Sequence, residues 1–397
     1  MRQQNQIIFI GEYLFPDGDA ASVRTFSLAC ICRDLGFKVT VIGKGQVRSE
    51  DYHREMDGYY IEGIRYSTMN PERVTMIQRF RHPVSRLKLY VSALKALDLE
   101  DIRAVIINAC SSARHVPFVS AFCRRKSIPL IGDICEWYDP STMDYGRLNP
   151  SYAVFSLIFH HYFPRFRNLI VVSKLLECHF KGEERNVMRI ASPLDVRNIP
   201  CTDRTPKDRL VLLYAGSPGR KDLLKEMLVA LASLAPEERL RIEFRLLGPT
   251  KEELIKLLGT SAGLLKLLGD TVRPMGRVPR HQVIEALQEA HFTVLLRPDK
   301  RYANAGFPSK VAESLAAGAP VLLNFTSDLG EYLGDENAAL RVHDSSPEEV
   351  AKAIRRALEL TTAELRDLRR CARAKAEQYF DYRLYLDSFT RYLGQLR

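Results

Sequence analysis

Short apolar runs alternate along the chain with longer stretches in which apolar residues recur at helical spacing. The first run predicts a buried strand over residues 7–11, and the next stretch predicts a helix over residues 20–35 that ends at Gly36. The same alternation continues through most of the sequence. It predicts βαβ units whose strands form parallel sheets.

The predicted strands fall into two series. The first comprises residues 7–11, 38–43, 104–109, 129–133, 169–172 and 187–191, with a hairpin over residues 59–67. The second comprises residues 210–216, 242–248, 272–276, 292–297, 320–325 and 338–342, separated by helices such as 223–234 and 282–290. A polar stretch, residues 195–208, contains two prolines and separates the series.

The two series predict an α/β protein with two Rossmann-like, doubly wound domains that face each other across a cleft, where such folds bind ligands. We place these domains at residues 1–196 and 209–375, joined by a linker at residues 197–208. Residues 376–397 are expected to form a helical tail that packs back on the N-terminal domain.

The composition narrows the classes of protein. The 397 residues are 46% hydrophobic, and no apolar run reaches the roughly 18 residues that a membrane-spanning helix needs. The polar residues 1–6 lead directly into a strand, so we expect no signal peptide and a cytoplasmic protein. The eight cysteines lack metal-ligand spacing, so we expect reduced residues rather than disulfides or a zinc site.

The formal net charge of +10 indicates an anionic partner: a phosphorylated ligand, a membrane surface or nucleic acid. No nucleic-acid partner is expected, because the sequence has no zinc finger, RNA-recognition signature or basic tail. Residues 73–97 interleave basic and apolar side chains, as do segments that lie on anionic membranes. The alternative is a solvated helix packed on its own sheet. The aromatic run at residues 152–163 belongs either to a membrane face or to the core.

A first stretch with candidate chemistry follows the predicted strand at residues 210–216. Gly216, Arg220 and Lys221 lie between this strand and a helix, where backbone amides and the helix dipole attract phosphate. Two cations at the positive end of a helix are unfavourable unless an anion arrives, and Asp222 offsets only part of their charge. We interpret the loop as a diphosphate site. The alternative is that both cationic side chains point into solvent.

The second stretch has the sequence AGFPSKVAESLAAGAPV. Gly306 lets a ligand approach the backbone, and the amides of Ser309 and Lys310 are expected to be donors in the first turn of a helix. Glu313 lies about one turn beyond Ser309 and would project towards the cleft. The alternative is a surface pair between Lys310 and Glu313.

This second stretch resembles the donor-binding signature of the retaining family-4 glycosyltransferases, which have the GT-B fold. Their signature is Glu-Gly-Phe-Gly, four variable residues and a second Glu, before a helix that closes in Ala-x-Gly-x-Pro-Val. Gly306 and Phe307 match its start, Glu313 its second Glu and residues 316–321 its end. Two positions differ: Ala305 replaces the first Glu and its contact with the donor sugar, and Pro308 replaces the second Gly and removes an amide donor.

The resemblance covers nearly the whole chain and is strongest over residues 210–342. It implies that the donor is a nucleoside-diphosphate sugar, that residues 1–196 bind the acceptor and that residues 209–375 bind the donor. Arg220 and Lys221 would bind the diphosphate and act in catalysis, since cations stabilise the departing phosphate. Glu313 would bind the ribose. The other implied donor-binding residues are Gly216, Val278, Gly306, Phe307, Ser309 and Lys310.

Neither a cofactor nor an essential metal is expected, because cations of the protein take the place of a metal in this family. For the acceptor, Gly18 and Asp19 correspond to a glycine-rich loop of the family, although the alternative for Asp19 is a helix cap. Asp133 and Glu136 follow a strand and suit the recognition of hydroxyl groups; the alternative is a packed loop. His115 lies near a functional histidine of some family members and is the third implied catalytic residue; its alternative is an ordinary surface position.

We therefore expect a hexosyltransferase that moves a sugar to a glycan or a lipid-linked acceptor, in the synthesis of cell-surface polysaccharide or glycolipid. Its expected location is cytoplasmic, with peripheral association with the inner face of the membrane as a further hypothesis. One alternative is a nucleotide-sugar epimerase, which would need an acid/base pair that we do not identify. The other is a catalytically silent GT-B nucleotide-binding protein, suggested by Ala305.

Overall fold

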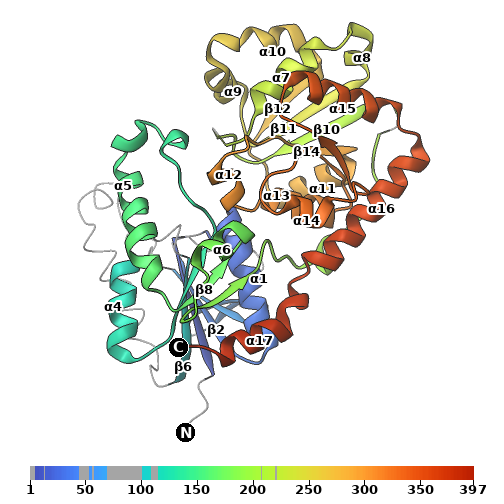
Figure 1. Ribbon diagram of the computed structural model, residues 1–397. Helices are drawn as coiled ribbons and strands as arrows, with labels where there is room; N and C mark the ends of the chain where they lie inside the picture. Colours follow the sequence, from blue (N-terminus) through green and yellow to red (C-terminus); the bar gives the residue numbers. More distant parts are fainter. Residues whose placement is uncertain are drawn as a thin grey trace. The chain divides into compact units, whose positions relative to one another are not determined.

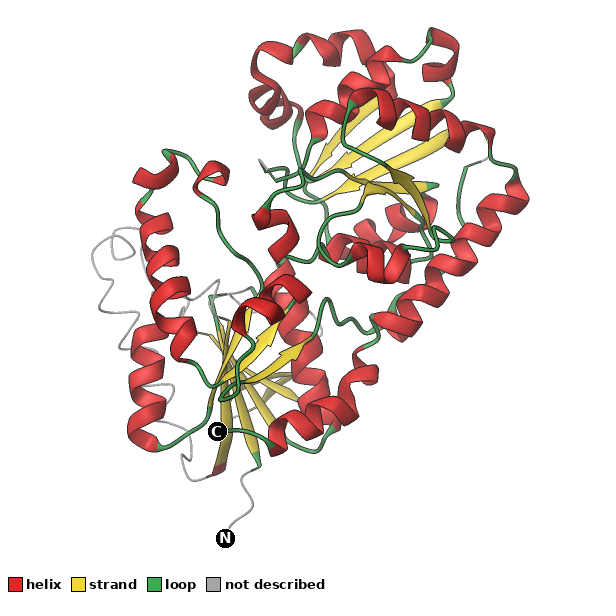
Figure 2. Ribbon diagram, viewed as in Figure 1, coloured by secondary structure: helices red, strands yellow, loops and turns green. Residues whose placement is uncertain are grey.

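The computed structural model describes residues 5–12, 14–43, 53–55, 58–68, 101–108, 115–206, 208–219 and 221–397. The chain forms two compact units, Met1–Leu194 with Tyr382–Arg397, and Asp195–Asp381 (Figures 1 and 2). Within the described ranges, no helix is long and apolar enough to cross a membrane. The basic segment 73–97 and Arg220 lie outside the described residues.

The first unit is built on one sheet whose strands follow the order β3-β4-β5-β2-β1-β6-β7-β8-β9. These strands are β1 (Gln6–Ile10), β2 (Lys38–Gly43), β3 (His53–Glu55), β4 (Gly58–Ile61), β5 (Ile64–Thr68), β6 (Ile102–Asn108), β7 (Leu130–Ile134), β8 (Asn168–Val171) and β9 (Asn186–Arg189). Strand β4 pairs antiparallel with β3 and β5, and the other neighbours pair in parallel. The strand order therefore reverses between β1 and β6, as in a doubly wound sheet.

The helices of the first unit include segments from both ends of the chain. They are α1 (Ala20–Asp34), α4 (Val116–Lys126), α5 (Pro150–Leu157) with a π-helical continuation (Ile158–Tyr162), α6 (Lys174–Phe180) and α17 (Leu386–Gly394). Short 3-10 helices occur at Pro140–Thr142, Gly146–Leu148, Phe163–Arg165 and Tyr382–Tyr385. Phe389 of α17 is fully buried in the same core as Leu28 of α1. Tyr382 begins the returning segment and donates its N–H to the carbonyl of Leu194 at 2.9 Å.

The second unit has a parallel sheet in the order β12-β11-β10-β13-β14-β15. Its strands are β10 (Leu210–Ala215), β11 (Ile242–Leu247), β12 (Val272–Gly276), β13 (Phe292–Leu295), β14 (Val321–Asn324) and β15 (Ala339–Val342). Its helices are α7 (Leu224–Ser233), α8 (Pro236–Leu240), α9 (Lys251–Leu258), α10 (Gly263–Leu268), α11 (Arg280–Glu289), α12 (Arg301–Ala305), α13 (Ser309–Ala316), α14 (Leu329–Leu333), α15 (Pro347–Glu359) and α16 (Thr362–Tyr379), with 3-10 turns at Val196–Asn198, Gly259–Ser261 and Gly269–Thr271.

Within the described residues, the predicted strands are confirmed, with ends that differ by at most about two residues. The doubly wound order of the second unit reverses between β10 and β13, so this unit has its topological switch point there. The predicted linker, residues 197–208, falls within the second unit.

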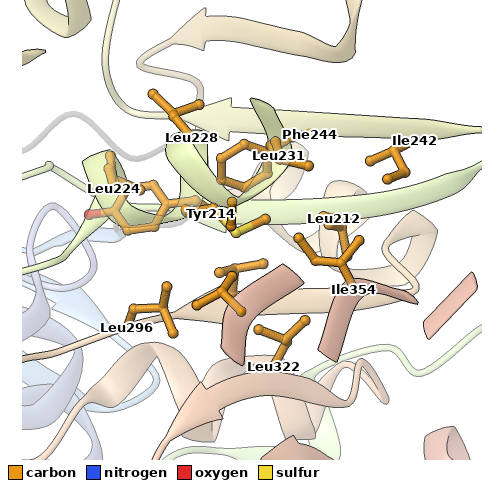
Figure 3. Packing of buried hydrophobic residues seen from close by; sticks show 14 of the residues in the cluster. Leu212, Tyr214, Leu224, Leu228, Leu231, Ile242, Phe244, Leu296, Leu322 and Ile354 are labelled. Carbon is orange, nitrogen blue, oxygen red and sulfur yellow. The ribbon is translucent and has the colours of Figure 1, made fainter. Parts of the chain in front are cut away.

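Alternate residues of β10 face opposite sides of the second sheet, as the period of a strand requires. Leu212 and Tyr214 pack with α7 and α15 in the core shown in Figure 3. Leu224, Leu228 and Leu231 recur at helical spacing on α7 and present one apolar face to these strands (Figure 3). Each fully buried leucine or phenylalanine stabilises the fold by about 1.5–3 kcal/mol. This core fixes β10, the strand that leads into the site.

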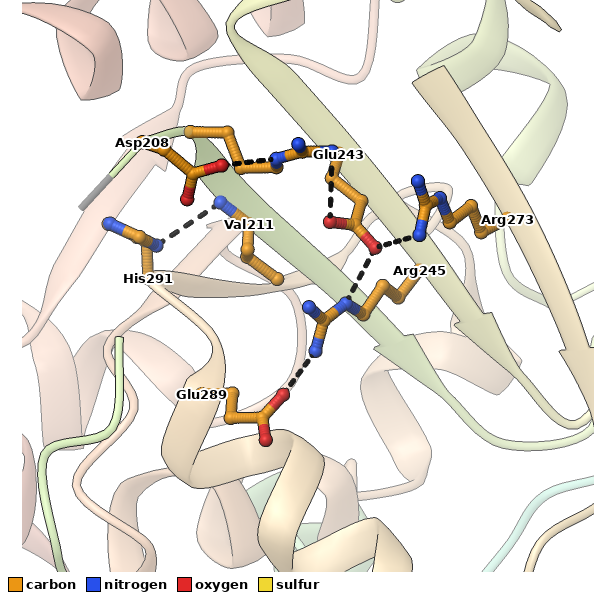
Figure 4. Close-up of polar contacts among 8 residues, drawn as sticks. Asp208, Val211, Glu243, Arg245, Arg273, Glu289 and His291 are labelled. Carbon is orange, nitrogen blue, oxygen red and sulfur yellow. Dashed lines mark hydrogen bonds and ion pairs between the residues drawn. The ribbon is translucent and has the colours of Figure 1, made fainter. Parts of the chain in front are cut away.

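A charged cluster links strands β10–β12 on the second sheet (Figure 4). Glu243 is only 4% exposed and accepts from Arg245 Nε at 2.9 Å, while Arg273 lies 3.4 Å from the same carboxylate. His291 precedes β13, and its Nδ1 accepts the N–H of Val211 at 3.1 Å (Figure 4). These contacts satisfy the hydrogen-bonding groups of buried side chains, so we assign the cluster a structural, stabilising role.

Candidate functional site

The carboxyl ends of β10 and β13 define the site in the second unit, because doubly wound sheets bind ligands where the strand order reverses. Gly216 directly follows β10 and Arg297 lies two residues beyond β13. Helix α13, which carries Lys310 and Glu313, packs on β13 and β14. Residues from three separate segments thus meet at the carboxyl-terminal ends of the central strands.

The backbone conformation of Gly216 favours glycine, and a larger residue there would also have to displace the end of the Lys310 side chain. Its φ is +145°, and a Cβ built on it would lie 2.4 Å from Cε of Lys310. Gly248, at the end of β11, approaches equally closely, since a Cβ there would lie 2.0 Å from the carbonyl oxygen of Gly216. The two glycines therefore allow the backbone and the Lys310 side chain to pack without a gap.

Lys310 projects from the first turn of α13 to a carboxylate on another segment. Its Nζ donates to Asp222 Oδ2 at 2.6 Å and to the hydroxyl of Tyr214 at 2.8 Å. The Tyr214 hydroxyl in turn donates to Asp222 Oδ2 at 2.6 Å, and the ammonium lies 4.2 Å from the centre of the Tyr214 ring. The alternative of a surface pair between Lys310 and Glu313 is wrong, because Lys310 pairs with Asp222.

Arg297 is the second cation at Asp222. Its Nε donates to Asp222 Oδ1 at 3.2 Å. Its backbone is fixed by Asn324 of β14, whose Oδ1 accepts the N–H of Arg297 at 2.9 Å and whose Nδ2 donates to the carbonyl of Arg297 at 2.7 Å. The neighbouring strand therefore orients the arginine towards the switch point.

The charges in this cluster depend on one another. Burial by itself would raise the pKa of Asp222, but Lys310 and Arg297 bring it below its ordinary value. Burial lowers the pKa of Lys310, and Asp222 opposes that effect. Burial and Asp222 together raise the pKa of Tyr214, so the phenol remains a neutral hydrogen-bond donor. The result is an ionised carboxylate that accepts from three side chains.

Glu313 lies one turn beyond Lys310, and both residues line a pocket of the second unit. The pocket is lined by apolar residues of β10, β13, α11 and α13, with Lys310 and Glu313 as its charged members. Arg280 of α11 lies 3.8 Å from Glu313 Oε1. Burial raises the pKa of Glu313, while Arg280 and Lys310 act against this shift. Such a carboxylate is suited to accept hydrogen bonds from neutral hydroxyl groups.

The other predicted donor-site residues surround this region or take structural roles. Gly306 ends α12 and is buried, and Ser309 begins α13. Phe307 packs edge-on against Tyr332 at 5.5 Å and against Phe380 at 5.7 Å. Val278 is half-buried in the loop between β12 and α11.

The loop after β10 differs from the expectation in one respect. Helix α7 begins at Leu224, so Lys221 lies in the loop before the helix rather than in its first turn. The helix dipole therefore acts less strongly on Lys221 than expected, because its effect is confined to the first turn. Arg220, in the same loop, lies outside the described residues.

Four residues of the site did not stand out in the sequence: Tyr214, Arg297, Arg280 and, as a buried ligand of cations, Asp222. Arg297 offered the clearest signal, because an arginine at the end of an apolar strand run is unusual in a buried sheet. Asp222 was interpreted as a charge that partly offsets its neighbours. It is instead only 9% exposed and is the central acceptor of the cluster.

In the first unit, Asp133 belongs to a buried ion pair. Arg24 of α1 donates from Nη2 to Asp133 Oδ1 at 2.8 Å and from Nε to both carboxylate oxygens. Arg24 also donates from Nη1 to the carbonyls of Ile190 and Ala191 at 2.8 and 2.9 Å. The pair therefore ties α1, β7 and the segment after β9 together, which is a structural role.

Gly18 and Asp19 also have local structural roles. Asp19 caps α1, since its Oδ1 accepts the N–H of Ser22 at 2.7 Å. A Cβ on Gly18 would lie 2.6 Å from Cβ of Leu14. The alternative that Asp19 is a helix cap is confirmed.

Glu136 lines an aromatic pocket in the first unit. The other lining residues are Trp137, Tyr138, Tyr152, Phe155, Ser156, Ile158, Phe159, His160 and Phe163. The Trp137 ring stacks on Phe159 at 4.3 Å and lies 4.5 Å from His179. Phe159 and Phe163 are buried, so this part of the aromatic run belongs to the core.

His115 lies at the start of α4, after β6, and is only 7% exposed, which corrects the alternative of a surface position. Its Nδ1 lies 3.5 Å from Glu12 Oε1, which follows β1. The two residues meet where the strand order of the first sheet reverses, the position at which this unit would bind a ligand. Among the described residues, no group of three or more His, Cys, Asp or Glu side chains could hold a metal ion.

Comparisons with known proteins agree with this architecture. Residues 197–378 match the family model described as Glycosyl transferases group 1. No curated protein matches the sequence. The chain is similar in fold to sucrose-phosphate synthase from Thermosynechococcus elongatus, with a TM-score of 0.73 and 16% identity over 99% of each chain.

Two other solved structures have the same fold over nearly the whole chain. One is Anabaena HepE in complex with UDP and glucose, with a TM-score of 0.69 and 14% identity over 98% of this chain and 99% of that chain. The other is WaaG, a glycosyltransferase involved in lipopolysaccharide biosynthesis, with a TM-score of 0.62 and 17% identity over 96% and 95% of the two chains. Residues 197–378 therefore match a glycosyltransferase group 1 domain, and the whole chain has the GT-B fold.

Proposed function

We propose that the protein is a retaining glycosyltransferase of family 4 that uses a nucleoside-diphosphate sugar as its donor. The observation that carries this proposal is the position of Lys310 and Glu313 at the switch point of the second unit, within the segment that matches the glycosyltransferase family. HepE, which has a similar fold, is a protein solved with UDP and with UDP-glucose. A donor of the same chemical class fits the cationic cluster here.

In this proposal, cations of the second unit bind the diphosphate. Lys310 and Lys221 lie among the described residues, and Arg220 precedes Lys221 in the sequence. The phosphate charge grows as the bond to the sugar breaks, so fixed cations stabilise the transition state more than the ground state. We propose that Gly216, Gly306 and Ser309 line the diphosphate and that Val278 and Phe307 flank the nucleoside.

Glu313 is proposed to bind the ribose. A carboxylate accepts hydrogen bonds from two neighbouring hydroxyl groups, and the ribose 2′ and 3′ hydroxyls form such a pair. Arg280 lies 3.8 Å from the same carboxylate and favours its ionised form. The ribose is common to all nucleoside-diphosphate donors, so this contact does not select the base.

The transfer step retains the anomeric configuration in this proposal. The acceptor hydroxyl oxygen forms a bond to the anomeric carbon on the face that the diphosphate leaves. The bond between that carbon and the phosphate oxygen breaks, and its electron pair leaves with the diphosphate. The proton of the acceptor hydroxyl passes to the departing phosphate oxygen. Protein cations balance the charge of the diphosphate, so this step uses neither a cofactor nor an essential metal.

We propose that the first unit binds the acceptor, a glycan or a lipid-linked sugar. Glu136 is the acidic residue of the aromatic pocket and is proposed to accept from acceptor hydroxyls. His115, paired with Glu12 at the switch point of the first sheet, is proposed as the residue nearest the reacting hydroxyl. Gly18, Asp19 and Asp133 are proposed to support the acceptor site through the structural contacts described above.

The product of a single turnover tests this function. The purified protein is incubated in excess over a radiolabelled sugar nucleotide, with a panel of glycan and lipid-linked acceptors, and the products are separated. Transfer of the label to an acceptor, with the α or β configuration of the donor retained, supports the proposal. Recovery of an isomerised sugar nucleotide would identify an epimerase, and binding without any product would identify a silent nucleotide-binding protein.

A further inference from the structure

Asp222 lies between two cations that come from different parts of the second unit. Lys310 reaches it from α13, and Arg297 reaches it from the end of β13. Asp222 itself belongs to the loop before α7, and Tyr214 of β10 donates a further hydrogen bond to it. One carboxylate therefore fixes the ends of three segments around the switch point.

Both cations keep N–H groups for a ligand. An ammonium has three N–H donors, and Lys310 uses two of them, on Asp222 and Tyr214. Arg297 contacts Asp222 through Nε, and among the described residues its two Nη nitrogens have no hydrogen-bond partner. Its side chain is nevertheless only 16% exposed. These donors are therefore available to a phosphate oxygen of a ligand.

We propose that Asp222 is the positioning residue of the phosphate site: it holds Lys310 and Arg297 together so that both direct their remaining N–H groups at one phosphate of the donor. This inference rests on the proposed function and adds Arg297 as a second phosphate ligand. Two cations and one carboxylate have a net charge of +1, which attracts an anionic phosphate. When no ligand is bound, the carboxylate reduces the repulsion between the two cations.

Tyr214 contributes to the geometry but not to the charge. Its hydroxyl donates to the Oδ2 atom that also accepts from Lys310, so it keeps the carboxylate in one orientation. Replacement of this tyrosine by phenylalanine removes its hydrogen bond to Asp222 and the one that Lys310 donates to it, and leaves the two ion pairs in place. The Tyr214→Phe variant therefore separates a change in the geometry of the cluster from a change in its charge.

The charge of Lys310 gives the inference a distinctive signature. The charged and titratable groups that face it are Asp222, Tyr214, Arg297 and Glu313. Burial and Arg297 lower its pKa, while Asp222 and Glu313 raise it. Without the Asp222 carboxylate, the pKa of Lys310 falls further, and the ammonium loses its proton at a lower pH than in the native protein.

Calorimetric titration with UDP, from about pH 7 to pH 9, tests the inference; the terminal phosphate is ionised throughout this range. We expect the affinity of the native protein to change less than about threefold across the range. Asp222→Asn is expected to bind at least about tenfold more weakly at pH 7, and its affinity should fall further as the pH rises. Tyr214→Phe should bind more weakly than the native protein but keep the native pH profile, because the Asp222 carboxylate and both ion pairs remain.

The outcomes separate this inference from the proposed function. If the native protein binds no member of a panel of nucleoside diphosphates, the proposed function fails. If it binds UDP and Asp222→Asn binds with the same affinity and pH profile, only the role of Asp222 is overturned.

Should Asp222→Asn not fold, Arg297→Gln provides the second measurement, since it keeps the pair between Lys310 and Asp222. We expect that variant to bind UDP about tenfold more weakly, with an unchanged pH profile. Native affinity in a folded Arg297→Gln protein would overturn the role of Arg297.

Discussion

The side chain of Lys310 occupies the space directly above Gly216, where a Cβ would lie 2.4 Å from Lys310 Cε. The φ of +145° explains why a glycine follows β10, and the contact places the ammonium of α13 at the carboxyl end of this strand. It also joins two stretches of sequence that were each interpreted as phosphate-binding for independent reasons.

Gly216→Ala should damage both the fold and the site. The φ of +145° is strained for alanine, and the added methyl group must displace Lys310, so we expect a loss of about 1–3 kcal/mol in the free energy of unfolding and at least a tenfold loss of UDP affinity. Urea unfolding and calorimetry measure these quantities. Gly219→Ala is the control, because the nearest atom to a Cβ there is 4.0 Å away. Native behaviour of Gly216→Ala would show that Lys310 does not need its present position.

Glu313→Gln should lower the rate of transfer by at least roughly tenfold, because the amide accepts hydrogen bonds more weakly and brings donors towards ribose hydroxyls. The loss should appear with every base and should be smaller for a 2′-deoxy donor, which has already lost one contact. Steady-state assays with both donors measure it. Glu285→Gln, an exposed position on α11, is the control. Full activity of Glu313→Gln would assign Glu313 only to its contact with Arg280.

Asp133→Asn should destabilise the first unit by about 3–5 kcal/mol, since it leaves the buried Arg24 guanidinium without its counter-ion. Urea unfolding measures the loss. Glu136→Gln is the comparison: we expect slower transfer, because Glu136 lines the aromatic pocket and is proposed to accept from acceptor hydroxyls. A stable Asp133→Asn protein with weakened acceptor binding would instead make Asp133 a direct acceptor ligand.

The second unit should lose stability in mild acid because of His291. Burial, followed by Arg369, lowers its pKa to about 4. An unfolded histidine has a pKa of about 6.5, so the unfolded state binds the additional proton first as the pH falls. The stability that depends on neutral His291 is therefore complete above about pH 6.5 and is lost towards pH 4, at most about 3 kcal/mol.

His291→Asn tests this dependence, because its amide oxygen can accept from Val211 without binding a proton. Urea midpoints at several pH values should show a smaller acid loss than in the native protein. His343→Gln, an exposed change, should keep the native acid loss. An identical pH profile in the native protein and His291→Asn would exclude His291 as the source.

Membrane association through residues 73–97 is an independent prediction. Each basic residue near an anionic surface contributes about 1 kcal/mol, so the protein should sediment with anionic vesicles at low salt and be released as salt rises. Zwitterionic vesicles are the control. Failure to bind anionic vesicles at low salt would make this segment ordinary protein surface.

The fold was largely predictable because buried parallel strands leave a strong pattern of apolar runs, and β10 to β15 all follow such runs. Gly216 and Lys310 stood out because they lie at a strand end and a helix start, and Glu313 because it matches the second Glu of the family signature. The residues that contact them in the structure did not stand out in the sequence. Lys310 meets Asp222 only because α13 and the loop before α7 converge at the switch point, which depends on the strand order.

Asp133 shows the same limit in the first unit. A carboxylate after a strand suggests a ligand, but Arg24 reaches it from α1 across a long sequence separation. No local pattern identifies such a partner, because the pairing depends on how α1 packs on the sheet. The predicted helix 20–35 was correct, and the use of Arg24 within it became apparent only in three dimensions.

The most direct measurement is a crystal structure of the protein with UDP. The account predicts that the nucleotide lies at the carboxyl ends of β10 and β13, with ribose hydroxyls within about 3 Å of the Glu313 carboxylate and a phosphate at the Lys310 ammonium. A nucleotide bound to the first unit, or one bound to the second unit with Glu313 still directed only at Arg280, would contradict it.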